Sequence, residues 1–103
     1  MVRLESTTVA SLQVVKGHHA GIVFPLYDRQ ILIGRLRSSD LPLEDGSVSR
    51  LHARLFSRDG CVFIEDLGSR WGTLVNGTPV SGHQRLDPDD LIQVGSVVLR
   101  FQP

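Results

Sequence analysis

Apolar residues in this chain fall in short runs that are rich in valine, isoleucine, leucine and phenylalanine. Turn-forming dipeptides such as Asp59-Gly60 and Asn76-Gly77 separate the runs at short intervals, and no window carries the period of an amphipathic helix. Short runs of β-branched and aromatic residues bounded by turns are typical of strands. The strands predicted from this pattern are 12–15, 22–26, 30–34, 41–43, 52–57, 62–66, 73–75, 78–80, 91–94 and 97–101.

The pattern indicates an all-β fold. Regular short strands without helices favour a sandwich or a barrel of antiparallel sheets. The dipeptides Asp59-Gly60 and Asn76-Gly77 tolerate positive φ, so both are expected to close tight hairpins. Residues 1–10 are polar apart from scattered apolar positions, and we expect them to form a flexible lead-in before a single domain over 11–103.

The balance of charge disfavours some classes of partner. Lys and Arg number 11, and Asp and Glu also number 11, so no overall field is present to hold a nucleic acid or an anionic membrane. A length of 103 residues is enough for one hydrophobic core. Every basic residue except Lys16 is an arginine, whose fixed pair of donors suits the forked recognition of an anion.

The cysteine content and the lack of long apolar stretches bear on the compartment. Cys61 is the one cysteine and lies in an apolar run, so we expect a buried thiol in a reducing environment. No apolar signal region opens the chain, and no stretch approaches the roughly 18 apolar residues that a membrane span requires. We therefore expect a cytoplasmic protein, and we expect it to be a monomer.

Three short motifs carry the candidate chemistry: Gly34-Arg35, Ser49-Arg50-Leu51-His52 and the segment 71–77. Each lies where a predicted strand runs out into a loop, and a sheet scaffold holds such loop ends rigid. A phosphorylated side chain carries roughly −1.5 to −2 charges and three acceptor oxygens, so its receptor needs cationic forks and hydroxyl or amide donors. Arg35, Ser49 and Arg50 supply these groups, and together they would suit a phosphate.

In their order and wider frame these motifs resemble the forkhead-associated (FHA) domain. The frame includes Asp45-x-x-Val48-Ser-Arg-x-His-Ala53, Asp66-Leu-Gly-Ser69 and Gly72-Thr-x-Val-Asn-Gly77, and the resemblance extends over residues 12–101. It implies an antiparallel β-sandwich of about eleven short strands that binds a phosphothreonine-containing protein or peptide with the loops at one end. It implies no catalysis, no metal and no cofactor.

The resemblance also implies roles for individual residues. Arg35 and Ser49 would contact the phosphate directly, and Arg50 would add a further contact or brace its loop. Arg70 stands where many relatives carry a short residue close to the phosphate, so it would add another guanidinium or remain a solvated arginine. The residues expected to support the site without binding are Gly34, His52, Ser69, Gly72, Thr73, Asn76 and Gly77.

Trp71 departs from the family pattern, because many relatives carry at this position an asparagine that bonds the peptide backbone beside the phosphothreonine. Tryptophan has one donor and no acceptor, so it cannot replace that amide. Trp71 would either offer an apolar platform to a peptide side chain, or pack inward, or cover the pocket. Ser47, Arg70 and Trp71 are the candidates for reading the third residue after the phosphothreonine, and we assign Trp71 and Ser47 to peptide binding.

Two other functions stay open. Because of Trp71, the domain could dock partners independently of phosphorylation. A small hydrolase using Ser49 and His52 is disfavoured, because His52 has no clear orienting partner and no Gly-x-Ser-x-Gly elbow surrounds Ser49. A phosphorylated threonine within Ser6-Thr7-Thr8 could also enter such a pocket, although capture within one molecule would be strained if the first strand begins far from the pocket.

Overall fold

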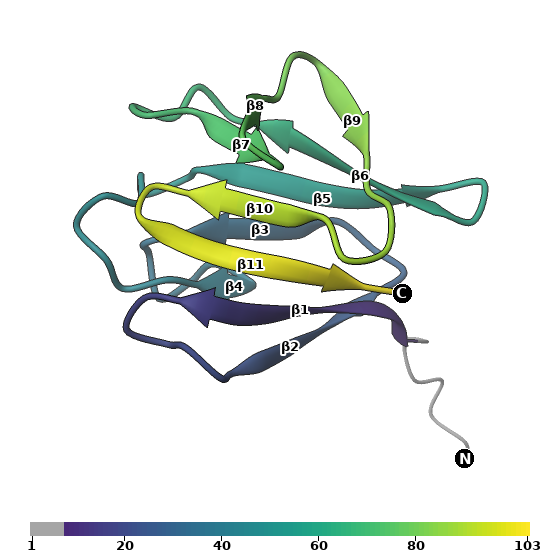
Figure 1. Ribbon diagram of the computed structural model, residues 1–103, viewed down its shortest axis with the longest axis horizontal. Helices are drawn as coiled ribbons and strands as arrows, with labels where there is room; N and C mark the ends of the chain where they lie inside the picture. The colour runs from purple at the N-terminus through teal and green to yellow at the C-terminus, as the bar shows by residue number, and fades with distance from the viewer. Residues whose placement is uncertain (1–7) are drawn as a thin grey trace.

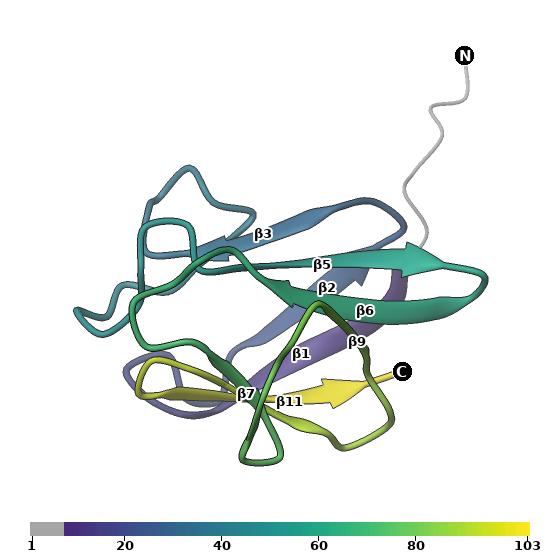
Figure 2. The same ribbon diagram turned by 90° about the horizontal axis from the view of Figure 1, so that it is seen from above.

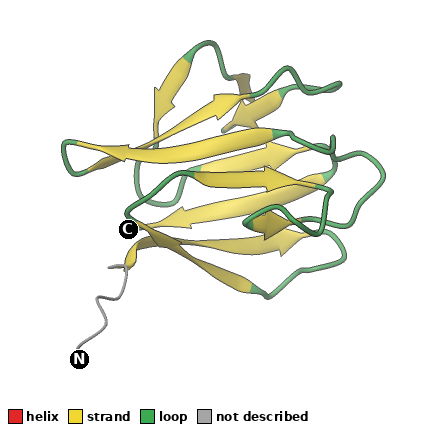
Figure 3. Ribbon diagram, turned by 180° about the vertical axis from the view of Figure 1, so that it is seen from behind, coloured by secondary structure: helices red, strands yellow, loops and turns green. Residues whose placement is uncertain are grey.

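The structure, a computed structural model, describes residues 8–103, which form two β-sheets packed face to face (Figures 1 and 2). All regular elements in this range are strands, joined by turns and loops (Figure 3). Residues 8–103 contain no helix long and apolar enough to cross a membrane. In chain order the strands are β1 (Thr8–Lys16), β2 (Val23–Tyr27), β3 (Ile31–Gly34), β4 (Leu41–Pro42), β5 (Ala53–Arg58), β6 (Cys61–Asp66), β7 (Thr73–Val75), β8 (Thr78–Pro79), β9 (His83–Arg85), β10 (Leu91–Val94) and β11 (Val97–Gln102).

The predicted sandwich of about eleven strands is confirmed. One sheet has the order β2-β1-β11-β10-β7-β8 and the other the order β4-β3-β5-β6-β9. All pairings are antiparallel except that of β3 with β4, which is parallel and joins Ile33 to Leu41. The expectation of purely antiparallel sheets is therefore wrong at this one pair. The parallel pairing is possible because a loop, and not a tight hairpin, joins β3 to the two-residue strand β4.

Alternating burial along the strands builds the core. In β1 the side chains of Ala10, Leu12 and Val14 are 5%, 0% and 1% exposed, while the residues between them lie half-buried on the outer face. Side chains on a strand point alternately to its two faces, so each sheet presents one apolar face to the other. The fully buried side chains include Leu12, Ile33, Leu55, Ile64, Ile92 and Leu99.

The first strand begins earlier than the sequence pattern indicates. Thr8 pairs with Tyr27 and Ala10 is buried, so residues 8–10, assigned above to the lead-in, belong to β1. The pairing with β2 and the buried alanine offset the lack of large apolar residues there. Residues 1–7, including Ser6 and Thr7, lie outside the described part of the chain.

The position of Thr8 bears on self-capture of a phosphorylated threonine. Strand β1 runs away from Thr8 to Lys16, and the loop that follows it reaches the loop before β5, where His19 Nε2 accepts a hydrogen bond from the Glu44 amide at 3.3 Å. The nine residues of β1 span roughly 26 Å at about 3.3 Å per residue. Thr8 therefore lies at the opposite end of the sandwich from the candidate loops, and its entry into the pocket of its own molecule is excluded while β1 is formed.

The two expected hairpin turns are confirmed. Asp59 and Gly60 have φ values of 52° and 77°, and Asn76 and Gly77 have 50° and 84°. Positive φ at both central residues defines the type I′ turn, whose twist matches that of the flanking strands. The first turn joins β5 to β6 and the second joins β7 to β8.

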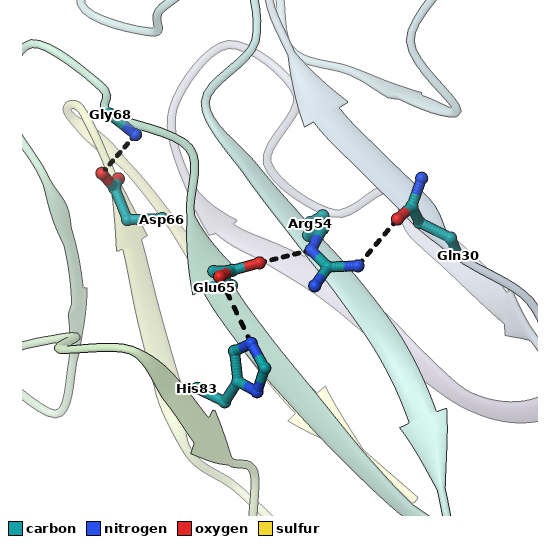
Figure 4. A network of polar contacts seen from close by, with 6 residues as sticks. All are labelled: Gln30, Arg54, Glu65, Asp66, Gly68 and His83. Atoms are coloured by element: carbon teal, nitrogen blue, oxygen red, sulfur yellow. Dashed lines mark hydrogen bonds and ion pairs between the residues drawn. The ribbon is translucent and has the colours of Figure 1, made fainter.

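A polar network on the outer face holds the strand that the sequence pattern missed, β9. Arg54 on β5 donates from Nε to Glu65 on β6, and Glu65 in turn lies 3.2 Å from His83 Nε2 on β9 (Figure 4). Arg54 also donates to Gln30 Oε1 at 2.8 Å. The hydrogen bond from Arg54 holds the pKa of Glu65 below its ordinary value. Strand β9 carries no apolar alternation, so charge and pairing with β6 define it instead.

We expect the core to dominate stability. Replacing Ile64, which is fully buried, by alanine should lower the free energy of unfolding by about 2–5 kcal/mol, because it removes buried methyl groups and leaves a cavity. The matched control is Val23→Ala on β2, where the side chain is 54% exposed and the cost should stay within about 0.5 kcal/mol. Urea unfolding followed by circular dichroism measures both, and equal costs would contradict the assignment of the core.

Candidate functional site

Three loops meet at the end of the sandwich opposite the C-terminus, at the left of Figure 2: one follows β3, one precedes β5 and one follows β6. The Arg35 amide donates to the Ser49 carbonyl oxygen at 3.0 Å, and the Arg70 amide donates to Ser49 Oγ at 3.0 Å. The three loops are thus joined directly by hydrogen bonds. Between them lies a shallow hollow of about 140 Å³, lined by Arg35, Gly46, Ser47, Val48, Ser49, Arg70 and Trp71.

Arg35 is the cation that the scaffold holds in a defined position. Its Nε donates to the Val48 carbonyl oxygen at 3.0 Å, while the side chain remains exposed beside the hollow. Among the described residues, none accepts a hydrogen bond from its two terminal amino groups. One edge of the guanidinium is therefore fixed to the protein, and the remaining donors are available to an anion.

Gly34 allows the close approach of two loops. A Cβ placed on this residue would lie 2.0 Å from the carbonyl oxygen of Arg50 and 3.1 Å from Ser39 Oγ. The absence of a side chain at Gly34 lets the backbone of the Ser49-Arg50 loop rest directly on the end of β3. Arg50 itself is exposed and does not line the hollow, although its backbone forms part of this contact.

His52 joins the loops from within the protein. It is fully buried, its Nδ1 accepts a hydrogen bond from the Ser49 amide at 3.0 Å, and its Nε2 donates to the Gly72 carbonyl oxygen at 2.9 Å. Both ring nitrogens are therefore engaged with backbone, and Ser49 Oγ is bonded to the Arg70 amide rather than to the imidazole. These contacts link the two loops, and they leave no free base beside a serine nucleophile.

Asp66 organises the loop between β6 and β7. Its Oδ1 accepts from the hydroxyls of Ser69 at 2.5 Å and Thr73 at 2.7 Å, and its Oδ2 accepts from the amides of Gly68 and Ser69. Burial alone would raise the pKa of Asp66, but these hydrogen bonds outweigh it and hold the pKa below its ordinary value. Ser69 and Thr73 thus both bond the carboxylate that organises this loop. Asp66 was not predicted as a support residue, although Asp before Gly and Ser is a signal for such a turn.

Ser47, which the sequence analysis assigns to peptide binding, is hydrogen-bonded within the protein. Its Oγ donates to Asp45 Oδ1 at 2.5 Å and accepts from the Ser96 amide at 2.8 Å, which ties this loop to the turn between β10 and β11. The Ser47 hydroxyl holds the pKa of Asp45 below its ordinary value. Ser47 lines the hollow, yet its hydroxyl is engaged within the protein. Ser96 lies far along the chain, and no local sequence signal indicates the contact.

Asn76 and Gly77 lie away from the hollow. Asn76 Nδ2 donates to Asp90 Oδ1 at 2.9 Å, and Asn76 Oδ1 accepts from the Leu91 amide at 2.9 Å. These contacts hold the start of β10 at the end of β7 remote from Trp71. The two residues stabilise a neighbouring loop, so any support they give the site acts through β7.

Trp71 is exposed at the rim of the hollow. Its exposed fraction is 66%, and the guanidinium carbon of Arg70 lies 5.1 Å from the centre of the indole ring. Inward packing of Trp71 into the core, one of the alternatives raised by the sequence, is therefore wrong. Arg70 and Trp71 form a cation–π pair beside Ser49.

Comparison with known proteins finds one matching family model and several related sequences. A family model described as the inner membrane component of T3SS, cytoplasmic domain, matches residues 13–103. The FHA domain-containing protein FhaB of Mycolicibacterium smegmatis is 34% identical over 89% of this chain and 59% of its own length. The oxoglutarate dehydrogenase inhibitor of Corynebacterium efficiens is 39% identical over 89% of this chain and 64% of its own length. The chain thus spans about three fifths of these curated relatives.

Solved structures give the same likeness across nearly the whole domain. A chain from a structural and functional analysis of phosphothreonine-dependent FHA domain interactions has a TM-score of 0.84 at 29% identity, covering 94% of this chain and 97% of that one. The FHA domain of the CT664 protein of Chlamydia trachomatis has a TM-score of 0.85 at 28% identity, covering 91% and 96%. The FhaA FHA domain complexed with the intracellular domain of Rv3910 has a TM-score of 0.82 at 29% identity, covering 90% and 99%.

We predict that Gly34→Ala displaces the Ser49-Arg50 loop, because the new Cβ would overlap the Arg50 carbonyl oxygen. The free energy of unfolding should fall by about 1–3 kcal/mol, the usual cost of overpacking. The control is Gly46→Ala in the same hollow, where no atom lies within 4 Å of the new methyl group and the change should stay within about 0.5 kcal/mol. Urea titration measures both variants, and an unchanged Gly34→Ala would contradict the close approach.

We predict that the Asp66 network weakens in acid. A carboxyl whose folded pKa is lowered stabilises the fold above its unfolded pKa of about 3.9, and this contribution disappears as the pH falls through the folded pKa. The difference in unfolding free energy between wild type and Asp66→Asn should thus be largest at pH 7 and shrink toward pH 3. Asp28→Asn, at an exposed carboxyl, serves as the control. A difference independent of pH would refute the assignment.

Proposed function

The chain belongs to the forkhead-associated (FHA) family of phosphothreonine-binding domains, and we propose that it binds phosphothreonine in a protein partner through Arg35, Ser49 and Arg70, with Arg50 as a further contact from outside the hollow. The observation that carries this assignment is the shared hollow: Arg35, Ser49 and Arg70 line it together although they come from three different loops. The family model that matches this chain describes a cytoplasmic domain of a type III secretion component, and that family is related to the FHA domains. The partner is a phosphothreonine-containing protein, bound for signalling or assembly.

The contacts within the site support a preorganised receptor for phosphate. Because Arg35 Nε is bonded to the Val48 carbonyl oxygen, its guanidinium loses little freedom when an anion binds. Ser49 Oγ accepts from the Arg70 amide, which leaves the hydroxyl hydrogen free to be donated to a phosphate oxygen. A phosphate placed between these two groups would receive hydrogen bonds from a cationic guanidinium on one side and from an uncharged hydroxyl on the other.

The relatives and the buried contacts also support proposals about catalysis and the cellular compartment. These relatives are regulatory and binding domains. We infer that this chain likewise binds without catalysis, because both ring nitrogens of His52 are hydrogen-bonded to backbone groups. We place it in the cytoplasm, which the lone thiol of Cys61 and the cytoplasmic description of the matching family support. We propose no nucleic-acid or membrane partner and a monomeric state.

A second candidate is docking that does not depend on phosphorylation. The observation in its favour is Trp71, whose exposed indole stands where many FHA domains use asparagine to hold the peptide backbone. An apolar surface of this kind can bind a partner without a phosphate. The two candidates differ in what Arg35 contributes, so one variant separates them.

We predict that Arg35→Ala weakens binding of a phosphothreonine peptide by about 10- to 150-fold, the loss expected for one or more hydrogen bonds to a charged group. Isothermal titration of a phosphothreonine peptide library, with its unphosphorylated counterpart, measures the effect. Arg58→Ala, at the remote end of β5, is the matched control and should leave affinity unchanged. Circular dichroism verifies that each variant is folded.

The same titrations identify the alternative. Equal binding of phosphorylated and unmodified peptides, together with an unaffected Arg35→Ala, would favour phosphorylation-independent docking over the proposed function. Ser49→Ala should lower affinity by a smaller factor than Arg35→Ala, because the hydroxyl is an uncharged donor of one hydrogen bond, whereas the guanidinium is a cation with several donors.

A further inference from the structure

We infer that Trp71 makes this domain selective for phosphothreonine peptides that carry a flat or apolar side chain close to the phosphothreonine, and that Arg70 positions the indole for this contact. The inference rests on the proposed function. Its first support is the exposure of Trp71, which at 66% is unusual for the residue that buries the most surface in proteins. Trp71 is also the only tryptophan in the chain.

The backbone on both sides of Trp71 is fixed to the phosphate site. Before it, the Arg70 amide donates to Ser49 Oγ at 3.0 Å. After it, the Gly72 carbonyl oxygen accepts from His52 Nε2 at 2.9 Å. The indole is therefore presented from an anchored segment, not from a freely moving loop, and a ligand that packs on it loses little additional chain entropy.

The side chain of Arg70 restrains the indole itself. Its guanidinium carbon lies 5.1 Å from the ring centre, within the range of a cation–π contact. Trp71 and Arg70 both line the hollow with Arg35 and Ser49, so an occupant of the phosphate position lies next to the ring. A side chain near the phosphothreonine thus reaches the indole while the phosphate stays in place.

The chemistry of this rim defines the class of peptide. Indole offers an extended apolar surface and a single N–H, so it selects by packing and stacking rather than by paired hydrogen bonds. Leucine, proline and aromatic side chains fit such a surface. Lysine and arginine do not, because Arg70 and Arg35 place positive charge on the same rim.

No other aromatic group of residues 8–103 combines exposure with proximity to the hollow. Phe56 and Phe63 stack with centroids 5.6 Å apart on the outer face, but both are half-buried. The guanidinium carbon of Arg54 lies 4.6 Å from the Phe56 ring centre, and that of Arg58 lies 5.5 Å from it. These two rings are therefore half-buried, whereas the Trp71 side chain stays 66% exposed even with Arg70 beside its ring.

The test is a set of phosphothreonine peptides in which each flanking position carries alanine, leucine, tyrosine or lysine in turn. For the wild-type domain we expect one position at which leucine or tyrosine binds about tenfold tighter than alanine, and lysine binds more weakly. Trp71→Ala should reduce the tenfold ratio to about one, while binding of the phosphothreonine peptide with alanine at that position remains measurable. Trp71→Phe should keep a ratio above about threefold.

Two further variants separate packing from loop integrity. Arg70→Ala should lower the leucine-to-alanine ratio, and Arg70→Lys should restore part of it through the same cation–π contact. Leu67→Ala, in the same loop and 36% exposed, is the matched control and should leave the ratio unchanged. Indole fluorescence gives an independent readout: the leucine phosphopeptide should shift the emission of Trp71 to shorter wavelength, and inorganic phosphate alone should not.

The possible failures are distinguishable. If phosphothreonine peptides bind and require Arg35, but the leucine-to-alanine ratio is the same in wild type and Trp71→Ala, this inference is overturned and the proposed function stands. If the wild-type domain binds no phosphothreonine peptide more tightly than its unmodified counterpart, the proposed function fails and the inference fails with it.

Discussion

The arrangement of the binding loops depends on one buried side chain, the imidazole of His52. Its ring joins the Ser49 amide to the Gly72 carbonyl oxygen, and its own backbone bonds the Ile33 carbonyl oxygen and the Leu67 amide. One residue therefore connects the end of β3, the loop before β5 and both parts of the loop after β6. In a buried site, loss of the ring would leave two backbone groups without partners, and each such group costs roughly 1–3 kcal/mol.

The sandwich separates two kinds of interaction in space. Between the sheets the contacts are apolar and specify the overall fold, since burial of Leu12, Leu55 and Leu99 requires only matched alternation. At the loop end, hydrogen bonds to the carboxylates of Asp66 and Asp45 specify the shape. Directional contacts are needed there because an anion receptor must hold its donors to within fractions of an ångström, which apolar packing alone does not ensure.

The sequence predicted those features of the fold and of the site that depend on local residue patterns. Alternation and turn dipeptides predicted ten of the eleven strands. The resemblance to the FHA pattern indicated that Arg35, Ser49 and Arg70 would lie near one another, and all three line the same hollow. Strand β9 was missed because pairing with β6 and the Arg54-Glu65-His83 contacts define it, and neither leaves an apolar period. The contact of Ser47 with Ser96 was missed for a related reason, since it joins loops from different sheets whose approach only the folded chain determines.

The exposure of Trp71 follows from how the rest of its loop is used. Ser69 and Thr73 turn their hydroxyls to Asp66, and Gly72, with a φ of 80°, directs its carbonyl oxygen to His52. These contacts involve the residues on either side of positions 70 and 71, whose own side chains contribute nothing to them. Replacement of an amide by an indole at position 71 therefore leaves the scaffold contacts in place and changes only the surface at the rim of the hollow. In this architecture the residues that hold the loops and those that face the ligand can vary separately.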